Sequence, residues 1–106
     1  MSDLLQGTLD LLILKILNLQ PMHGFGISAR IQQISGEIFQ VNQGSLYPAL
    51  HRLEQKGWIE AKWDITENNR KAKYYRLTRT GKKQLQKEEK EWIVLSKAIR
   101  RILQAV

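Results

Sequence analysis

The sequence contains no cysteine in its 106 residues and has only two histidines, His23 and His51. Disulfide bonds and thiolate metal sites are therefore excluded, and a reducing cytoplasm is the expected setting. The two histidines fit no HExxH motif or Ser-His-Asp order, and no glycine-rich loop that could cradle a phosphate follows a strand. Acids are few and scattered, so chemistry by paired carboxylates is disfavoured. We expect no enzyme, no metal site and no cofactor.

A long hydrophobic run is also absent. The longest apolar-rich stretch, residues 9–19, is interrupted by Asp10, Lys15 and Asn18. It is too short to span a bilayer and lacks the basic leader of a signal peptide, so we expect no membrane partner. Hydrophobic residues make up 42% and charged residues 25% of the chain, which is typical of one globular domain with a single core.

The positive charge is concentrated in the second half of the chain. Residues 1–55 hold three bases and four acids, a net charge of −1, whereas residues 56–106 hold 14 bases and six acids, a net charge of +8. A basic field of this kind favours nucleic acid or another anionic surface as the partner. Charge alone does not separate this interpretation from that of an ordinary basic protein.

The first half of the chain predicts two helices. The first begins near Thr8 and is apolar almost all the way round, so it is either a central core helix or covered partly by a second subunit. Its candidate subunit contacts are Leu9, Leu12 and Ile16. A proline and glycine break over 20–24, with His23 as a turn residue, leads to a second helix over 25–35. We expect one brief strand over 37–41, and inward side chains on the second helix at Phe25, Ile27, Ile31 and Ile34.

Residues 42–56 predict the helix around which the chain is organised. Leu46, Leu50 and Leu53 fall at i, i+4 and i+7 and form one buried stripe. Asn42 or Ser45 can cap the start and Gly57 can end the helix. Pro48 leaves the start open: a start at Ser45 places the proline in the first turn, whereas a start at Asn42 costs one intrahelical hydrogen bond. The opposite face is polar and cationic and includes no acid at Gln43, Ser45, Tyr47, His51, Arg52 and Gln55.

A β-hairpin follows over residues 58–77. Apolar residues alternate with polar ones over 59–65, which predicts a half-buried strand, and a second strand covers 72–77. Asn68 and Asn69 favour a tight turn between the strands. The tip of the hairpin carries Arg70 and Lys71, with Lys73 behind it.

The last segment predicts one long helix, capped by Thr78 or Thr80. Leu85, Trp92 and Ile99 are seven residues apart, and Leu95 and Ile102 follow Trp92 and Ile99 by three. This spacing is a heptad seam, interrupted by Glu88. The seam predicts a homodimer, with packing against the first helix as the alternative.

The predicted elements follow the order of a winged helix-turn-helix: helix, helix, turn, helix, hairpin and helix. The expected fold class is therefore mainly α (α+β). In this fold the third helix enters the major groove of double-stranded DNA and the hairpin, or wing, lies against the adjacent backbone or minor groove. We expect DNA contacts from the helix over 42–56 and from wing residues 66–73. Arg70, Lys71 and Lys73 would contact phosphates independently of sequence. The candidate contact residues are Gln43, Ser45, Tyr47, Pro48, His51, Arg52, Asn69, Arg70, Lys71 and Lys73.

Four segments closely resemble the PadR-like transcriptional regulators: LLQGTLDLLILK (4–15), PMHGFGI (21–27), QGSLYPALHRLEQKGWI (43–59) and KYYRLTRTG (73–81). The resemblance implies a bacterial dimeric repressor of the short subfamily, with a winged helix-turn-helix over 1–77 and a dimerisation helix over 78–106. Phe25 stands where the family commonly has tyrosine, and Ser45 where threonine is frequent. In multidrug-binding short members, a tryptophan at the position of Trp92 stacks on flat aromatic ligands between the subunits, which makes a small planar aromatic effector a candidate partner here. The alternative is that Trp92 only fills the dimer core.

We therefore expect a homodimeric DNA-binding regulator acting on a pseudo-palindromic operator. The alternative is a basic dimeric module that binds a protein partner or an anionic membrane surface through its last helix. That alternative leaves the acid-free face around Tyr47 without a role.

Overall fold

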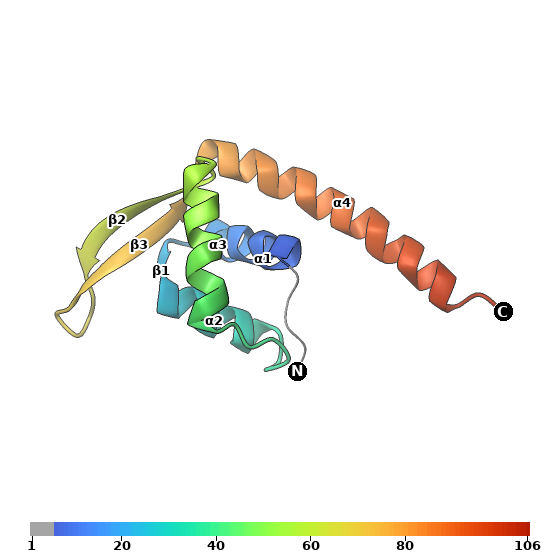
Figure 1. The fold of residues 1–106 in the computed structure, drawn as a ribbon, viewed down its shortest axis with the longest axis horizontal. Coiled ribbons are helices and arrows are strands. Elements are labelled where there is room, and N and C mark those ends of the chain that lie inside the picture. The colour runs from blue at the N-terminus through green and yellow to red at the C-terminus, as the bar shows by residue number, and fades with distance from the viewer. Residues whose placement is uncertain (1–5) are drawn as a thin grey trace.

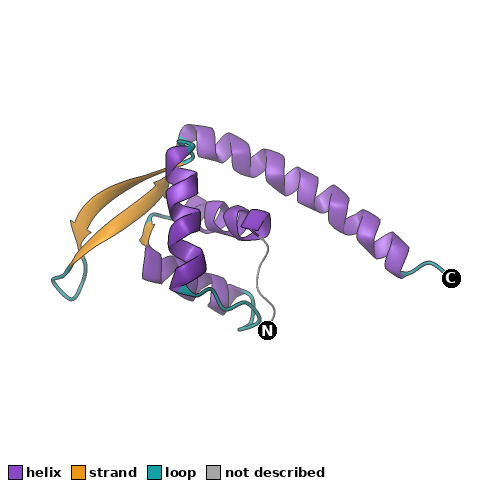
Figure 2. Cartoon of the chain, in the orientation of Figure 1, coloured by secondary structure: helices purple, strands orange, loops and turns teal. Residues whose placement is uncertain are grey.

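The protein is described by a computed structural model that covers residues 6–106 (Figure 1). It is elongated, with principal extents of 58 × 30 × 21 Å, because the last helix leaves the body on the side opposite to the β-hairpin. Helices make up most of the chain (Figure 2). The elements in chain order are α1 (Gln6–Leu19), β1 (Met22–His23), α2 (Gly24–Ile34), α3 (Gln43–Gln55), β2 (Ile59–Ile65), β3 (Lys71–Leu77) and α4 (Arg79–Leu103).

Helix α1 is the centre of the core. It contacts α2, α3, α4 and β3, and its residues Ile13 and Leu14 are fully buried. Leu9 and Ile16, expected to meet a second subunit, are also buried by the chain itself, while Leu12 stays half-buried. The expectation of a subunit contact at Leu9 and Ile16 is thus corrected, because a single core already covers most of this helix.

Helix α2 packs through a narrower stripe than expected. Ile27 and Ile31, one turn apart, are buried, but Phe25 and Ile34 are 71% and 58% exposed. The prediction that all four point inward was wrong. Phe25 lies two residues before Ile27 and so points to another side of the helix. Ile34 shares the stripe with Ile27 and Ile31, but it is the last residue of α2 and stays exposed. The expected strand over 37–41 is also wrong, because this segment is a loop. The short strand β1 instead lies before α2.

The sheet has the antiparallel order β1-β3-β2. Strands β2 and β3 form the predicted hairpin, in which Ile59 pairs with Leu77 and Ile65 with Lys71. Only the base of the hairpin is in the core, where Ile59 and Tyr75 are buried. The rest of the wing extends into solvent (Figure 1).

Helix α4 is anchored at its start. The Thr78 Oγ1 accepts the Gly81 N–H at 3.0 Å and donates to the Gly57 carbonyl oxygen at 2.7 Å, so Thr78 rather than Thr80 is the cap. Gly81 packs against backbone: a Cβ there would lie 1.9 Å from the Trp58 carbonyl oxygen. The architecture is the winged helix-turn-helix expected from the element order, followed by one long helix. None of the described helices is both long and apolar enough to cross a membrane.

Candidate nucleic-acid interface

The position of α3 is fixed by one buried stripe and one cap. Leu46, Ala49, Leu50 and Leu53 are buried against the body. The Asn42 Oδ1 accepts the Ser45 N–H at 2.9 Å, so the helix begins directly after Asn42. Residues of the opposite face are exposed, as expected: Gln43, Ser45, Tyr47, Pro48 and His51.

Pro48 lies inside α3 and not in its first turn. Having no N–H, it cannot bond to the carbonyl of Gly44 four residues earlier. The helix therefore tolerates one missing hydrogen bond at its exposed N-terminal end, which settles the alternative that the sequence left open.

Arg52 does not lie freely on the exposed face. Its Nη2 donates to the Asp10 Oδ1 of α1 at 2.9 Å. Asp10 is the buried charged residue of the described core, with 6% of its surface exposed, and the Arg52 side chain is 29% exposed. The ion pair makes Arg52 less available to a base edge than the sequence indicates, because the guanidinium neutralises a buried carboxylate.

Lys73 also interacts with other residues of the chain. Its Nζ lies 3.3 Å from the Glu54 Oε1 of α3 and 5.6 Å from the centre of the Tyr75 ring. This pair links the wing to α3 and leaves Lys73 half-buried. Burial of Tyr75 raises the pKa of its hydroxyl above the ordinary value of 10.0, while the Lys73 charge opposes the shift.

The wing tip presents cations without internal partners. The turn is closed by the Thr66 N–H, which donates to the Arg70 carbonyl oxygen at 2.8 Å, and by the Asn69 N–H, which donates to the Thr66 carbonyl oxygen at 2.9 Å. Asn69 adopts a φ of 60°, as expected for asparagine in a tight turn. Arg70 and Lys71 are exposed and form no ion pair with any acid of the described residues.

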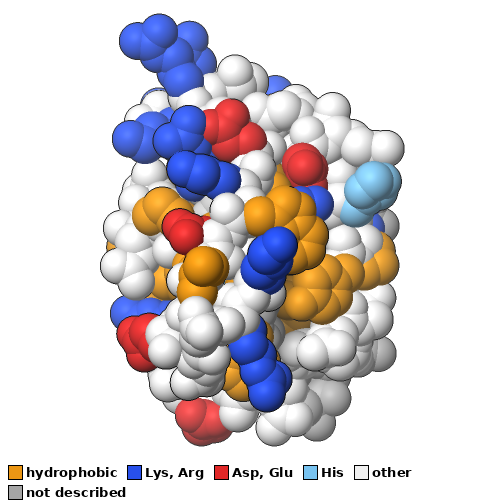
Figure 3. Space-filling model, turned by 90° about the vertical axis from the view of Figure 1, so that its left-hand side faces the viewer, with side chains coloured by type: hydrophobic (Ala, Val, Ile, Leu, Met, Phe, Trp, Pro, Cys, Tyr) orange, Lys and Arg blue, Asp and Glu red, His pale blue; other side chains and the backbone are white. Residues whose placement is uncertain are grey.

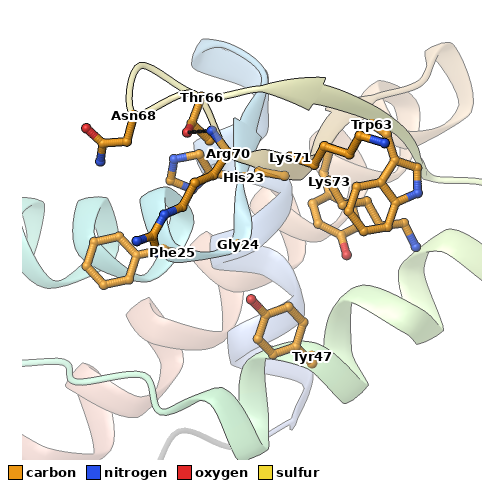
Figure 4. Close-up of a pocket in the computed structure, with 12 residues that line it drawn as sticks. His23, Gly24, Phe25, Tyr47, Trp63, Thr66, Asn68, Arg70, Lys71 and Lys73 are labelled. Carbon is orange, nitrogen blue, oxygen red and sulfur yellow. Dashed lines mark hydrogen bonds between the residues drawn. The ribbon is translucent and has the colours of Figure 1, made fainter.

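A pocket of about 680 Å³ separates the wing from α2 and α3. Figure 4 shows Tyr47 pointing from α3 into this pocket and Arg70 extending from the wing towards the start of α2. The Tyr47 hydroxyl lies close to Gly24, where a Cβ would be only 3.0 Å away. The pocket thus has aromatic walls and a basic rim.

Sequence reasoning missed two parts of this pocket. The first is the start of α2, where the His23 Nδ1 accepts the Gly26 N–H at 3.0 Å and caps the helix. A two-residue strand carries no periodic signal, so β1 could not be found in advance. The second is Trp63, which was assigned to a half-buried strand but is 65% exposed.

The surface on the wing side of the molecule mixes cationic and hydrophobic side chains. In Figure 3, which views it from that side, Lys and Arg side chains lie among hydrophobic ones near the middle of the face. A surface that alternates cations with exposed aromatic rings is suited to a polyanion with apolar parts, such as a nucleic acid.

The predicted seam on α4 is mostly uncovered. Leu85 is buried in the chain's own core, so its assignment to a subunit interface is corrected. The four following seam residues are between 45% and 74% exposed: Trp92, Leu95, Ile99 and Ile102.

A shallow hollow of about 330 Å³ lies where α4 passes the start of α1. Its lining includes Leu11, Glu88, Trp92 and Leu95. One Glu88 oxygen, Oε2, is buried there without a hydrogen-bond partner among the described residues. Across residues 6–106, no group of His, Asp and Glu side chains is arranged to hold a metal ion.

Comparison with known proteins gives one consistent result. A family model described as "Transcriptional regulator PadR-like family" matches residues 13–87. "Uncharacterized protein X" from Lysinibacillus sphaericus is 36% identical over 98 residues, covering 92% of this chain and 90% of that protein.

Solved structures agree with the family model. A transcriptional regulator from Clostridium thermocellum is 30% identical, with a TM-score of 0.87 over 97% of this chain and 100% of the other. A PadR-like transcriptional regulator from Bacillus cereus is 28% identical, with a TM-score of 0.84 over 99% of this chain and 100% of the other. Both matches include the wing and the long last helix.

Proposed function

The chain belongs to the PadR-like family of transcriptional regulators, which are not enzymes, and from this premise we propose that it is a homodimeric repressor of a pseudo-palindromic operator. One observation carries the proposal: Tyr47, on the acid-free exposed face of α3, and the unpaired cations of the wing tip line the same pocket. Nothing within residues 6–106 covers either surface.

The exposed face of α3 is the part that reads sequence. Gln43 and His51 offer hydrogen bonds to base edges in the major groove, and Ser45 is a donor or acceptor for either a base or a phosphate. The Tyr47 ring can contact a thymine methyl group. Arg52 is excluded from this set because Asp10 holds it.

The wing supplies affinity that does not depend on sequence. Arg70 and Lys71 are free to pair with phosphates, and each such contact releases counterions from the duplex. Asn69 can donate to a phosphate oxygen from the turn. Lys73 would need to leave Glu54 to do the same, so we assign it a supporting role.

A second copy of the chain covers the seam on α4. Trp92, Leu95, Ile99 and Ile102 would otherwise leave an apolar stripe in water, which monomeric proteins rarely tolerate. Pairing through residues 78–106 holds two DNA-binding units, each formed by residues 1–77, at a fixed spacing. The two copies of α3 would then enter successive major grooves, with half-sites about one helical turn, roughly 34–36 Å, apart.

The hollow beside Trp92 is the place for an effector. A small planar aromatic molecule would stack on the Trp92 indole there, at the interface between the two subunits. Because α1 also packs on α3, a shift at this hollow changes the spacing of the two recognition helices. Coupling between such sites is typically worth about 1–3 kcal/mol.

Binding-site selection tests the proposal. The protein is incubated with a random-sequence duplex library, bound DNA is enriched, and the affinity of the resulting duplex is measured by fluorescence anisotropy at several salt concentrations. We expect an inverted repeat to be enriched and its affinity to fall steeply with salt. No enrichment, or an affinity independent of salt, would contradict the proposal.

The effector is tested separately by titrating planar aromatic compounds against tryptophan fluorescence. Trp92→Phe is the control, since Trp58 and Trp63 also emit. Quenching should be lost in the variant, and a compound that binds should weaken the complex with the enriched duplex. Quenching that persists in Trp92→Phe would remove the effector from this site.

A further inference from the structure

One face of the wing carries an apolar stripe that leaves the core. Ile59, Ala61, Trp63 and Ile65 alternate along β2 and share one face. Ile59 is buried and Ala61 is packed against the core, but Trp63 and Ile65 are 65% and 60% exposed. A large ring and a β-branched side chain therefore project beyond the body on the inner face of the wing, the face that turns towards α3.

The two faces of the wing differ in charge. On the inner face, Lys73 lies directly across from Trp63 and Lys71 directly across from Ile65, and the strands carry no acid there. On the outer face, Glu60 pairs with Arg76, and a further acid, Asp64, is present. The outer face has the mixed charges of an ordinary solvated surface, whereas the strand residues of the inner face are apolar, aromatic or cationic.

The stripe is continuous with the surface assigned to DNA. Trp63, Lys71 and Lys73 line the same pocket as Tyr47 of α3, and Figure 4 shows the Trp63 and Lys73 side chains on the pocket side of the wing. A second hollow lies near Trp63, Ile65 and Lys71, and Asp64 of the outer face also lines it. A duplex that contacts α3 has the inner face of the wing beside it.

We propose that Trp63 and Ile65 form an apolar contact surface for the minor groove of the operator, next to the major groove that α3 enters. The inference rests on the proposed function and adds residues to it that are neither basic nor part of the recognition helix. The walls of the minor groove are deoxyribose rings, which are apolar, and its rims are phosphates. Trp63 and Ile65 pack on the sugars, and Lys71 pairs with a phosphate at the rim.

Dimensions agree with this assignment. Residues two apart on a strand are separated by about 6.6–6.8 Å, and the minor groove is about 6 Å wide. Side chains at this spacing fit one after the other along the groove, where each can contact its sugar walls. Apolar side chains in the minor groove are a known means of fixing DNA position and width.

The test compares Trp63→Ala and Trp63→Phe with wild type on the duplex enriched from the library. Removal of the ring should weaken binding about tenfold or more, the size expected for truncation of a tryptophan that binding buries. Trp63→Phe should restore most of the loss. Lys62→Ala, on the outer face of the same strand, is the control and should change affinity much less than Trp63→Ala.

Base analogues test the groove. In the segment under the wing, dA·dT pairs are replaced by dI·dC, which keeps the minor-groove acceptors but changes the major groove. We expect this change to have little effect there. Replacing dI·dC by dG·dC adds an amino group to the floor of the minor groove, and it should weaken wild type several-fold but Trp63→Ala much less.

Three results would overturn the inference while leaving the proposed function in place. One is unchanged operator affinity in Trp63→Ala, and another is an equal dG·dC penalty in wild type and variant. The third is a dimer that dissociates in Trp63→Ala, measured by sedimentation without DNA, since the stripe would then be a subunit contact. Failure to enrich any duplex would instead refute the proposed function. Because Trp63 is exposed, the variant should fold, and circular dichroism verifies this.

Discussion

Loss of the Arg52–Asp10 ion pair should destabilise the fold and leave the operator preference intact. Arg52 lies on α3, where a basic residue is easily taken for a guanine reader. Its Nη2 instead lies 2.9 Å from the Asp10 Oδ1, and Asp10 is 6% exposed. Arg52→Ala therefore leaves the buried Asp10 carboxylate of α1 without its partner.

The size of the effect follows from burial. Removal of one partner from a fully buried ion pair costs about 3–5 kcal/mol. The Arg52 side chain is 29% exposed, so water partly screens the pair, and its Nε is buried without a partner. We therefore expect a loss of about 1–3 kcal/mol in the free energy of unfolding. A domain of this size is stable by about 5–15 kcal/mol, so the variant still folds at 25 °C.

The assay is urea unfolding followed by circular dichroism at one fixed protein concentration, since dimer stability depends on concentration. A double-mutant cycle with Arg52→Ala, Asp10→Ala and the double variant isolates the interaction between the two side chains. The double variant should lose less than the sum of the single variants, because it leaves no unpaired charge. Asp10→Asn is the conservative control, as its amide oxygen still accepts from Arg52.

Operator preference is measured in parallel by repeating the library selection with Arg52→Ala. The same inverted repeat should be enriched. Two results would refute this reasoning. One is that the stability losses in the cycle are additive. The other is that Arg52→Ala is as stable as wild type but selects a different base at one position of each half-site. Arg52 would then be a reader and its contact with Asp10 incidental.

Three further predictions concern packing, charge and pH. In urea unfolding, Gly81→Ala should lower the free energy of unfolding by about 3 kcal/mol or more, because the added Cβ would lie 1.9 Å from the Trp58 carbonyl oxygen. Gly7→Ala is the control and should be neutral or stabilising, because a Cβ there meets no atom within 4 Å. Lys71→Ala should weaken binding to all duplexes alike and reduce the slope of log affinity against log salt by about one, whereas a loss confined to one sequence would contradict a phosphate contact. Burial raises the pKa of the Tyr75 hydroxyl, so its contribution to stability is complete below the unfolded-state pKa of 10.0 and is lost as the pH rises through the folded-state pKa. Between pH 8 and 11, the urea midpoint of unfolding should therefore decline less in Tyr75→Phe than in wild type. An identical decline would contradict the raised pKa.

Local sequence signals predicted most of the fold. These signals depend only on residues that are close in the sequence. They are the leucine spacing in α3, the alternation in β2 and the cap residues Asn42 and Thr78. Such signals fix where an element lies and which face it buries. The winged helix-turn-helix followed from their order.

What the sequence could not show depends on distant contacts. Asp10 and Arg52 are 42 positions apart, and no local pattern indicates that they pair. The alternation in β2 identified the strand and the apolar face of the wing but not the point at which the core ends. Trp63 was therefore expected to be buried but is 65% exposed. Burial at Leu85 likewise depends on how α4 crosses the body.

The candidate DNA contacts were selected by chemical type, and the structure separates them by availability. Tyr47, Arg70 and Lys71 remain exposed, whereas Lys73 and Arg52 are held by acids from other elements. Tyr47, Arg70 and Lys71 line one pocket between the wing and α3. Their roles in DNA binding stay predictions.

Sedimentation velocity on a fluorescently labelled copy of the enriched duplex tests the central claim most directly. If paired α4 helices hold two copies of α3 at the spacing of successive major grooves, saturated complexes contain two chains per duplex. Inserting half a helical turn between the half-sites should then abolish the tight complex. A stable complex with one chain, or one indifferent to the insertion, would contradict the account.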